Sequence, residues 1–146
     1  MATILSADEV REYLSDYPDS NLLLDREEFS DTFIELCMGL ALSEFNAMPP
    51  RTIFTNDELF PSKSLLLLGT CWQMFQGRSA MMARNHLTYS DGGLQIPVEE
   101  KYELYVGLAS SFKNAFDSAA AKLKVHMNME QGWGAVSSDE ANFPIW

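Results

Sequence analysis

The chain has 146 residues, 47% of them hydrophobic and 21% charged, and its formal net charge is −11. This composition is that of a globular protein and excludes a disordered or collagen-like chain, and a domain of about 150 residues can bury roughly 68–70% of its unfolded surface in one core. The acids are concentrated early, since residues 1–60 carry 13 acidic and 3 basic side chains, which argues against general binding to a nucleic-acid backbone.

Two helices are predicted in the first 50 residues. Ser6 and Glu9 form an S-x-x-E capping box that begins a short helix, which should end at Tyr17 because a proline follows it. Ser30 begins a second helix that ends before Pro49. The apolar residues expected on the buried faces are Val10, Tyr13 and Leu14 in the first helix, and Ile34, Met38, Ala41 and Phe45 in the second.

A third helix is predicted over residues 62–86 and is apolar on nearly every side, which is typical of a central helix. Gly69 and Gly77 each cost about 1 kcal/mol inside a helix, so either neighbouring helices approach closely there or the helix breaks at Gly77. Cys37 and Cys71 lie in apolar helical runs, which favours buried free thiols. The first ten residues lack a signal-peptide pattern and no apolar run approaches the ~20 residues of a membrane helix, so we expect no membrane contact and a reducing compartment.

A small β-hairpin is predicted over residues 86–97, where Asp-Gly stands between alternating apolar and polar residues. With Asp91 and Gly92 as the two-residue turn, Tyr89 opposes Leu94 and the apolar side chains share one face. Shifting the turn by one residue would pair Asp91 with Leu94 and mix the two faces, so we favour the first register.

The last long helix is predicted to begin with Pro97 and to run to residue 128, completing a helical bundle domain of residues 1–128. Its basic end should hold Lys122, Lys124 and His126. Its apolar stripe, close to heptad spacing, is Tyr102, Val106, Ala109, Phe112, Phe116, Ala119 and Leu123.

Residues 129–146 form a predicted extended C-terminal tail, because two glycines, several polar residues and a proline disfavour a regular helix. Its aromatic side chains are costly to leave in water, and so are the apolar residues of the hairpin. We therefore expect both segments to be covered by other chains. The residues predicted to form this interface are Tyr89, Asp91, Gly92, Leu94, Trp133, Phe143, Ile145 and Trp146.

No catalytic, metal-binding or cofactor-binding motif is found in the sequence. The only histidines, His86 and His126, lie in different predicted elements, and the chain has no C-x-x-C pair, H-E-x-x-H, G-x-G-x-x-G, Walker loop or G-x-S-x-G. The glycines after Asp91 lack the lysine of a phosphate-binding loop. The sequence therefore indicates a structural protein, neither an enzyme nor a cofactor-binding protein.

The order of elements resembles the all-helical head-tail connector or adaptor proteins of tailed bacteriophages over roughly residues 4–128. The capped opening helix S-A-D-E-V-R-E-Y-L, residues 6–14, carries part of this resemblance. It implies a ring, commonly dodecameric, that binds the portal protein and a tail or second neck protein and extends the DNA channel. DNA passes through such a ring without sequence-specific binding. The family is made in the host cytoplasm, resides in the virion neck and has no catalytic residues.

Three alternatives stay open at this point. Another phage neck or tail-completion protein would share the pattern. A cellular helical interaction module would use the Met-rich third helix as a groove for a partner helix. A small enzyme with an unfamiliar site would use Tyr89, Asp91 or His86, and a pocket joining His86 to a carboxylate would favour it.

Overall fold

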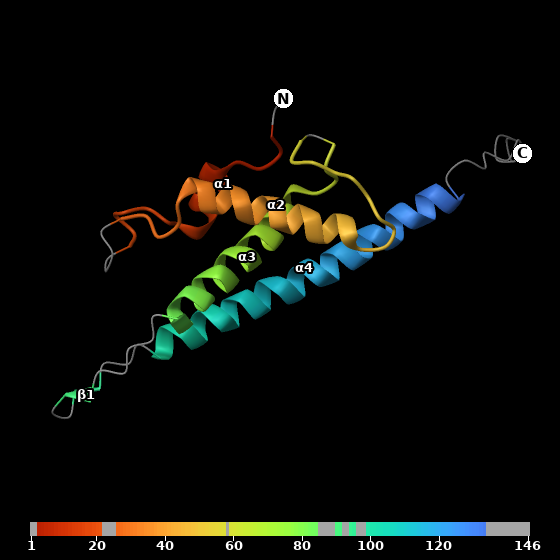
Figure 1. The fold of residues 1–146 in the computed structure, drawn as a ribbon. Coiled ribbons are helices and arrows are strands. Elements are labelled where there is room, and N and C mark those ends of the chain that lie inside the picture. Colours follow the sequence, from red (N-terminus) through yellow and green to blue (C-terminus); the bar gives the residue numbers. More distant parts are fainter. Residues whose placement is uncertain are drawn as a thin grey trace, which may run out of the picture.

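The computed structural model describes residues 3–21, 26–57, 59–84, 90–91, 94–95 and 99–133. Most of them are helical, which confirms the prediction of a mainly α-helical protein. Within these ranges the helices are α1 (Ala7–Leu14), α2 (Asp31–Ala47), α3 (Lys63–Arg84) and α4 (Glu99–Trp133). Helix α3 packs against both α2 and α4, so it is the central helix as predicted. Figure 1 shows α3 and α4 side by side in opposite directions.

The predicted capping box begins α1. The Ser6 hydroxyl accepts a hydrogen bond from the Glu9 amide at 3.3 Å, and the Glu9 carboxylate accepts one from the Ser6 amide at 3.1 Å. The helix ends earlier than predicted, at Leu14, followed by Ser15 with a left-handed φ of 53°. Val10 is buried and Leu14 packs against the core as predicted, but the expected burial of Tyr13 is wrong, because Arg11 is buried and Tyr13 is 54% exposed.

Helix α2 agrees with the sequence pattern at both ends and on its buried face. The Ser30 hydroxyl accepts from the Phe33 amide at 3.3 Å, and the helix stops at Ala47, before Pro49. The four residues expected in the core are all buried: Ile34, Met38, Ala41 and Phe45.

Close approach of three helices explains the glycine in the middle of α3. A Cβ atom at Gly69 would lie 2.7 Å from Phe116 Cε2 of α4 and 2.8 Å from Ala41 Cβ of α2. A Cβ at Gly77 would lie 2.9 Å from Phe33 Cζ, and α3 continues through Gly77 without a break. Of the two predicted roles for these glycines, close packing is therefore the correct one.

The buried face of α4 differs from the prediction at its first turns. Tyr102 and Val106 are more than a third exposed, while Tyr105, Ala109 and Phe116 contact the core. A straight helix drifts by about 20° per heptad, so a stripe drawn at strict heptad spacing leaves the buried face over several turns.

Helix α4 also extends to Trp133, five residues beyond the predicted end of the helical domain. The exposed Gly132 costs only about 1 kcal/mol, which is too little to stop a helix that continues through the His126–Glu130 pair. The predicted basic end is wrong as a consequence, because the last turn of α4 holds no basic residue. Residues 134–146 of the predicted tail lie outside the described residues.

The hairpin predicted over residues 86–97 is not seen at that length among the residues described there. Only β1 (Ser90–Asp91) and β2 (Leu94–Gln95) pair, antiparallel and with Asp91 opposite Leu94. The favoured register with Tyr89 opposite Leu94 is therefore wrong. The observed register leaves two glycines between the paired residues, and two-residue hairpin turns often require positive φ angles that only glycine adopts without strain.

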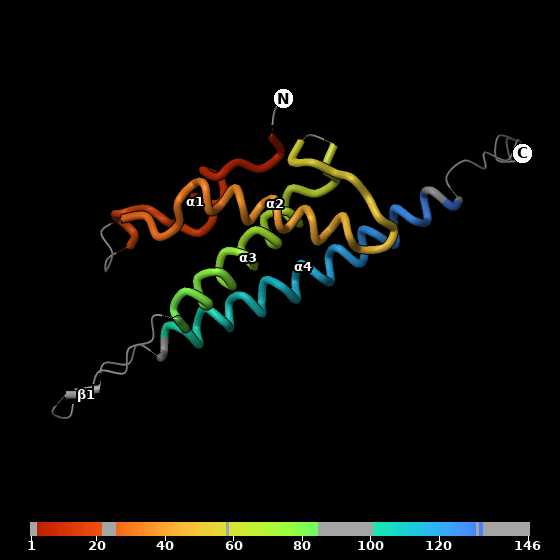
Figure 2. Tube along the Cα trace, in the orientation of Figure 1, coloured from red at the N-terminus to blue at the C-terminus, as the bar shows by residue number. Residues whose placement is uncertain are grey.

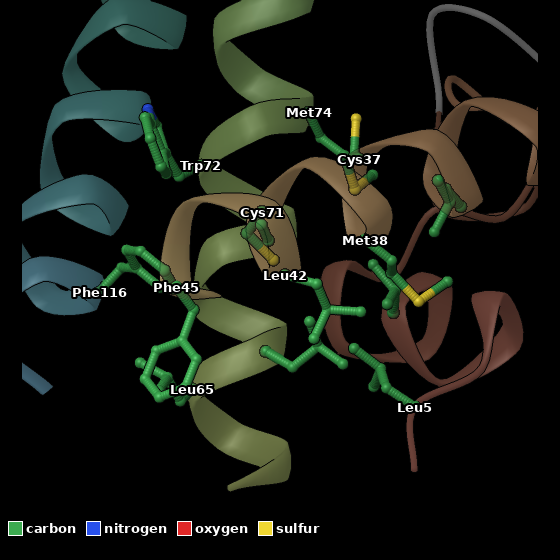
Figure 3. Packing of buried hydrophobic residues seen from close by; sticks show 14 of the residues in the cluster. Leu5, Cys37, Met38, Leu42, Phe45, Leu65, Cys71, Trp72, Met74 and Phe116 are labelled. Atoms are coloured by element: carbon green, nitrogen blue, oxygen red, sulfur yellow. The ribbon is translucent and has the colours of Figure 1, made fainter. Parts of the chain in front are cut away.

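The core is one continuous cluster contributed by all four helices and the connecting segments. Figure 2 traces how the chain brings these segments together, and Figure 3 shows Cys37 and Cys71 inside the cluster. Both cysteines are free and buried, as predicted, and burial raises their pKa to about 11 and about 12 respectively. Within the described ranges, no helix combines the length and hydropathy needed to cross a bilayer.

The Gly69→Ala variant should be about 1–3 kcal/mol less stable than Gly107→Ala, because overpacking forces α2, α3 and α4 apart. Gly107→Ala on α4 is the control, since no atom outside its own stretch of helix lies within 4 Å of the added Cβ. Both variants gain up to about 1 kcal/mol from helix propensity. Denaturant unfolding measures both, and equal stability of Gly69→Ala and Gly107→Ala would contradict the proposed packing.

Cys37 and Cys71 should not react with a disulfide reagent at pH 8 in the native protein, because buried thiols with raised pKa form little thiolate. Both should react promptly in denaturant. Fast labelling of either thiol under native conditions would show that the core opens easily around it.

Candidate functional site

A buried arginine ties α1 to the start of α2. Arg11 is 3% exposed, and its Nη1 lies 3.0 Å from the Phe29 carbonyl, 3.1 Å from a Glu27 carboxylate oxygen and 3.3 Å from Asp16. Its Nη2 also pairs with Asp31. Burial opposes the charge, but the hydrogen bond that Arg11 donates to Asp31 and the surrounding carboxylates outweigh it, so the pKa of Arg11 is raised.

Asp16 orders the backbone that leads into α2. Its carboxylate accepts hydrogen bonds from the Glu28 amide at 2.7 Å, the Phe29 amide at 3.0 Å and Asn21 Nδ2 at 2.6 Å. A buried carboxylate is stable only when its oxygens are paired in this way. Arg11 and Asp16 therefore fix residues 26–31 on the surface of the bundle.

The surface that these contacts position is a groove of about 550 Å³ between the start of α2 and the end of α3. We call it the arginine groove. Glu28 Oε1 accepts from Arg78 Nε at 3.0 Å and from the Tyr105 hydroxyl at 2.6 Å, which joins the groove to α4. Much of its lining consists of three arginines and three apolar side chains: Arg26, Arg78, Arg84, Phe29, Phe33 and Met81.

A second buried cation holds the connection between α2 and α3. Lys124 of α4 is 3% exposed, and its Nζ donates to the Pro50 carbonyl and to Thr52 Oγ1, both at 2.8 Å. The same Nζ lies 4.2 Å from the centre of the Phe45 ring. Among the described residues no carboxylate pairs with Lys124, and burial lowers its pKa.

The segment held by Lys124 presents apolar side chains to solvent. Asn46 accepts from the Phe54 amide at 3.0 Å and donates to the Phe54 carbonyl at 2.8 Å, so the backbone is fixed on both sides. Ile53 is nevertheless 96% exposed and Leu59 is 79% exposed. We call residues 49–57 the Ile53 loop, whose backbone is held in place while Ile53 is uncovered.

Helix α4 carries an exposed stripe beside its buried face. The stripe positions follow alternating spacings of four and three, the heptad pattern of helix pairing. Large apolar residues occupy both ends and small residues occupy the middle. We define the α4 stripe as Leu104, Leu108, Ser111, Ala115, Ser118, Lys122, Val125 and Met129. Every member is exposed, with Leu104 at 66% and Val125 at 58%.

The described side chains form no catalytic arrangement. His126 is exposed and pairs with Glu130 at 3.1 Å across one helical turn, the surface position expected of it. The pKa of Tyr105 is raised by burial and by its hydrogen bond to Glu28, which disfavours its ionised form. In the described ranges, no group of three or more His, Cys, Asp or Glu residues is placed to hold a metal ion.

The structure places few of the residues that the sequence predicted for an interface. Asp91 and Leu94 lie in the short paired strands, and Trp133 is the last residue of α4. The other five, together with His86, lie outside the described residues: Tyr89, Gly92, Phe143, Ile145 and Trp146. Their role in an interface stays a prediction.

Sequence reasoning missed the α4 stripe and the Ile53 loop. The heptad spacing from Leu104 to Met129 was available in the sequence, but the neighbouring stripe ending at Leu123 was assigned as the apolar face instead. Exposure of Ile53 depends on the long-range bonds of Lys124, and no local pattern indicates it.

Comparison of the chain with protein-family models, curated proteins and solved structures finds no match. The proposed function therefore rests on the surfaces described above.

The Lys124→Met substitution should release the Ile53 loop, because methionine keeps the apolar stem but cannot bond to Pro50 and Thr52. Amide hydrogen exchange at Thr52 and Phe54 should become faster, corresponding to a local loss of about 1–3 kcal/mol. Lys122→Met, on an exposed lysine two residues earlier, should leave both amides unchanged. Unaltered exchange in Lys124→Met would show that the loop is held by other contacts.

Proposed function

We propose that the chain is a structural subunit whose copies associate through α4 and close into a ring. The observation that carries this proposal is the α4 stripe, an exposed heptad pattern on a helix of 35 residues. A helix of that length spans about 52 Å. The two ends of the stripe, Leu104 with Leu108 and Val125 with Met129, are exposed large apolar residues, and exposed apolar patches commonly mark a protein contact.

The composition of the stripe supports helix pairing more than binding of a small molecule. Leu104 and Leu108 at one end, and Val125 and Met129 at the other, supply apolar area for burial. The residues at positions 111, 115 and 118 between them are serine, alanine and serine, whose short side chains let a second helix approach closely. Heptad spacing keeps such a seam facing its partner when the two helices wind around each other in a left-handed supercoil.

The more specific proposal is a head-tail connector or adaptor of a tailed bacteriophage, located in the virion neck. Its support is the resemblance of the opening helix and of the element order, together with the concentration of acidic residues in the first 60 positions of the chain. In this role the ring binds a portal protein and a tail or second neck protein, and an acidic wall lets DNA pass without adhering.

A cellular helical interaction module is the second candidate, and the burial of α3 gives it less support. Met74 is fully buried and α3 is covered by α2 and α4, so the predicted Met-rich groove is mostly core. Of the described methionines of α3, Met81 is the one that lines the arginine groove. A stable complex with a cellular protein, formed while the α4 stripe stays exposed, would favour this candidate.

The Leu108→Glu substitution should weaken self-association roughly tenfold or more in the association constant, because burial of one leucine contributes about 1.5–3 kcal/mol. Sedimentation velocity over a concentration series measures this. Wild-type chain should pass from monomer to one species of fixed mass larger than a dimer, because a ring requires a heterologous contact, whereas pairing of the stripe with itself stops at a dimer.

Ser110→Glu is the matched control, since it adds the same charge to the same turn but lies roughly 120° around the helix from Leu104. Ser110 is exposed, so both variants should keep monomer stability within about 0.5 kcal/mol. A wild-type chain that stays monomeric at every soluble concentration, or equal association of Leu108→Glu and wild type, would contradict the proposal.

A further inference from the structure

We propose that the arginine groove of one copy binds the C-terminal segment, residues 134–146, of a neighbouring copy. The inference rests on the proposed function in that it requires copies to associate. It adds the second half of a head-to-tail contact, in which a groove on one subunit receives a segment from the next.

The groove has the chemistry to bind an acidic and aromatic peptide. Arg26 and Arg84 are exposed at its rim. Phe29 and Phe33 stack with ring centres 6.1 Å apart, and Met81 lies beside them in the lining. Arginine pairs well with carboxylates, and a groove of this size holds small ligands or a few side chains.

The two acids nearest this surface already have partners. Glu27 pairs with Arg11, and Glu28 accepts from Arg78 and Tyr105. Among the described residues, no carboxylate pairs with Arg26 or Arg84, which are the groove arginines that can pair with an incoming acidic segment.

The segment 134–146 has matching composition. It carries Asp139 and Glu140 and no basic residue, followed by Phe143, Ile145 and Trp146. Within a chain of net charge −11, a short acidic and aromatic segment needs a site that is both basic at its rim and apolar at its base. The arginine groove provides this combination.

The length of α4 keeps the acidic residues and Phe143 of the segment away from the groove of their own chain. The Tyr105 hydroxyl lies at the groove, 2.6 Å from Glu28, while α4 continues for 28 more residues to Trp133, or about 42 Å. Glu140 follows Trp133 by seven residues and Phe143 by ten, spans of at most about 25 Å and 36 Å. Only the last residues, such as Trp146 with a full extension of about 47 Å, span that length, so Glu140 and Phe143 can enter the groove of another copy but not their own.

Photocrosslinking of the full chain tests this assignment. Chain with Phe143→p-benzoylphenylalanine is mixed with ¹⁵N-labelled chain of natural sequence, irradiated at concentrations where sedimentation shows association, and mapped by mass spectrometry. Adducts should appear on the labelled chain within residues 26–33 or 77–84. Arg84→Glu in the labelled chain should reduce the yield several-fold, whereas Lys113→Glu, on an exposed lysine outside both the groove and the α4 stripe, should not.

Adducts within the same chain, adducts elsewhere on the neighbour, the absence of adducts, or a yield insensitive to Arg84→Glu would each overturn the assignment. Sedimentation of the same sample separates this failure from failure of the proposed function. If a species of fixed mass forms but the adducts lie elsewhere, the ring proposal stands and the groove assignment falls. If the chain stays monomeric, both fall.

Discussion

The contact of three helices at Gly69 determines which surfaces of this protein are left uncovered. At that point Phe116 of α4 and Ala41 of α2 lie within 3 Å of where a side chain would begin. No residue with a Cβ fits there without a shift, so the rotation of α4 about its own axis is fixed by the core. One consequence is that Tyr105, Ala109 and Phe116 face inward. The other is that the α4 stripe faces out.

Two buried cations hold the connecting segments in place, as the close contact at Gly69 holds the helices. Arg11 gathers carboxylates from three positions around the start of α2, and Lys124 binds the turn after α2 through Pro50 and Thr52. Removing one partner from such a buried group is costly because the other is left unpaired. The arginine groove and the Ile53 loop are therefore held in place from within, at some cost in desolvation.

Local sequence signals predicted the elements well where local physics decides them. The Ser6 and Ser30 caps and the inward face of α2 follow from short-range hydrogen bonds and from one strong periodicity. Prediction failed where distant contacts decide. Arg11 is buried on α1 and Tyr13 is not, and the hydrogen-bond partners of Arg11 are up to 20 residues away. Packing of Phe116 against α3 sets which face of α4 is buried. Gly132 does not end α4, because the free-energy cost of continuing the helix through one glycine is small.

We propose that the protein is an assembly component whose function lies in its surfaces. Electron microscopy of the native assembly tests this most directly, because it shows both symmetry and subunit boundaries. The account predicts closed rings with rotational symmetry in which the outer side of α4 lies between adjacent copies. Isolated molecules only, or rings in which that side of α4 faces solvent, would contradict it.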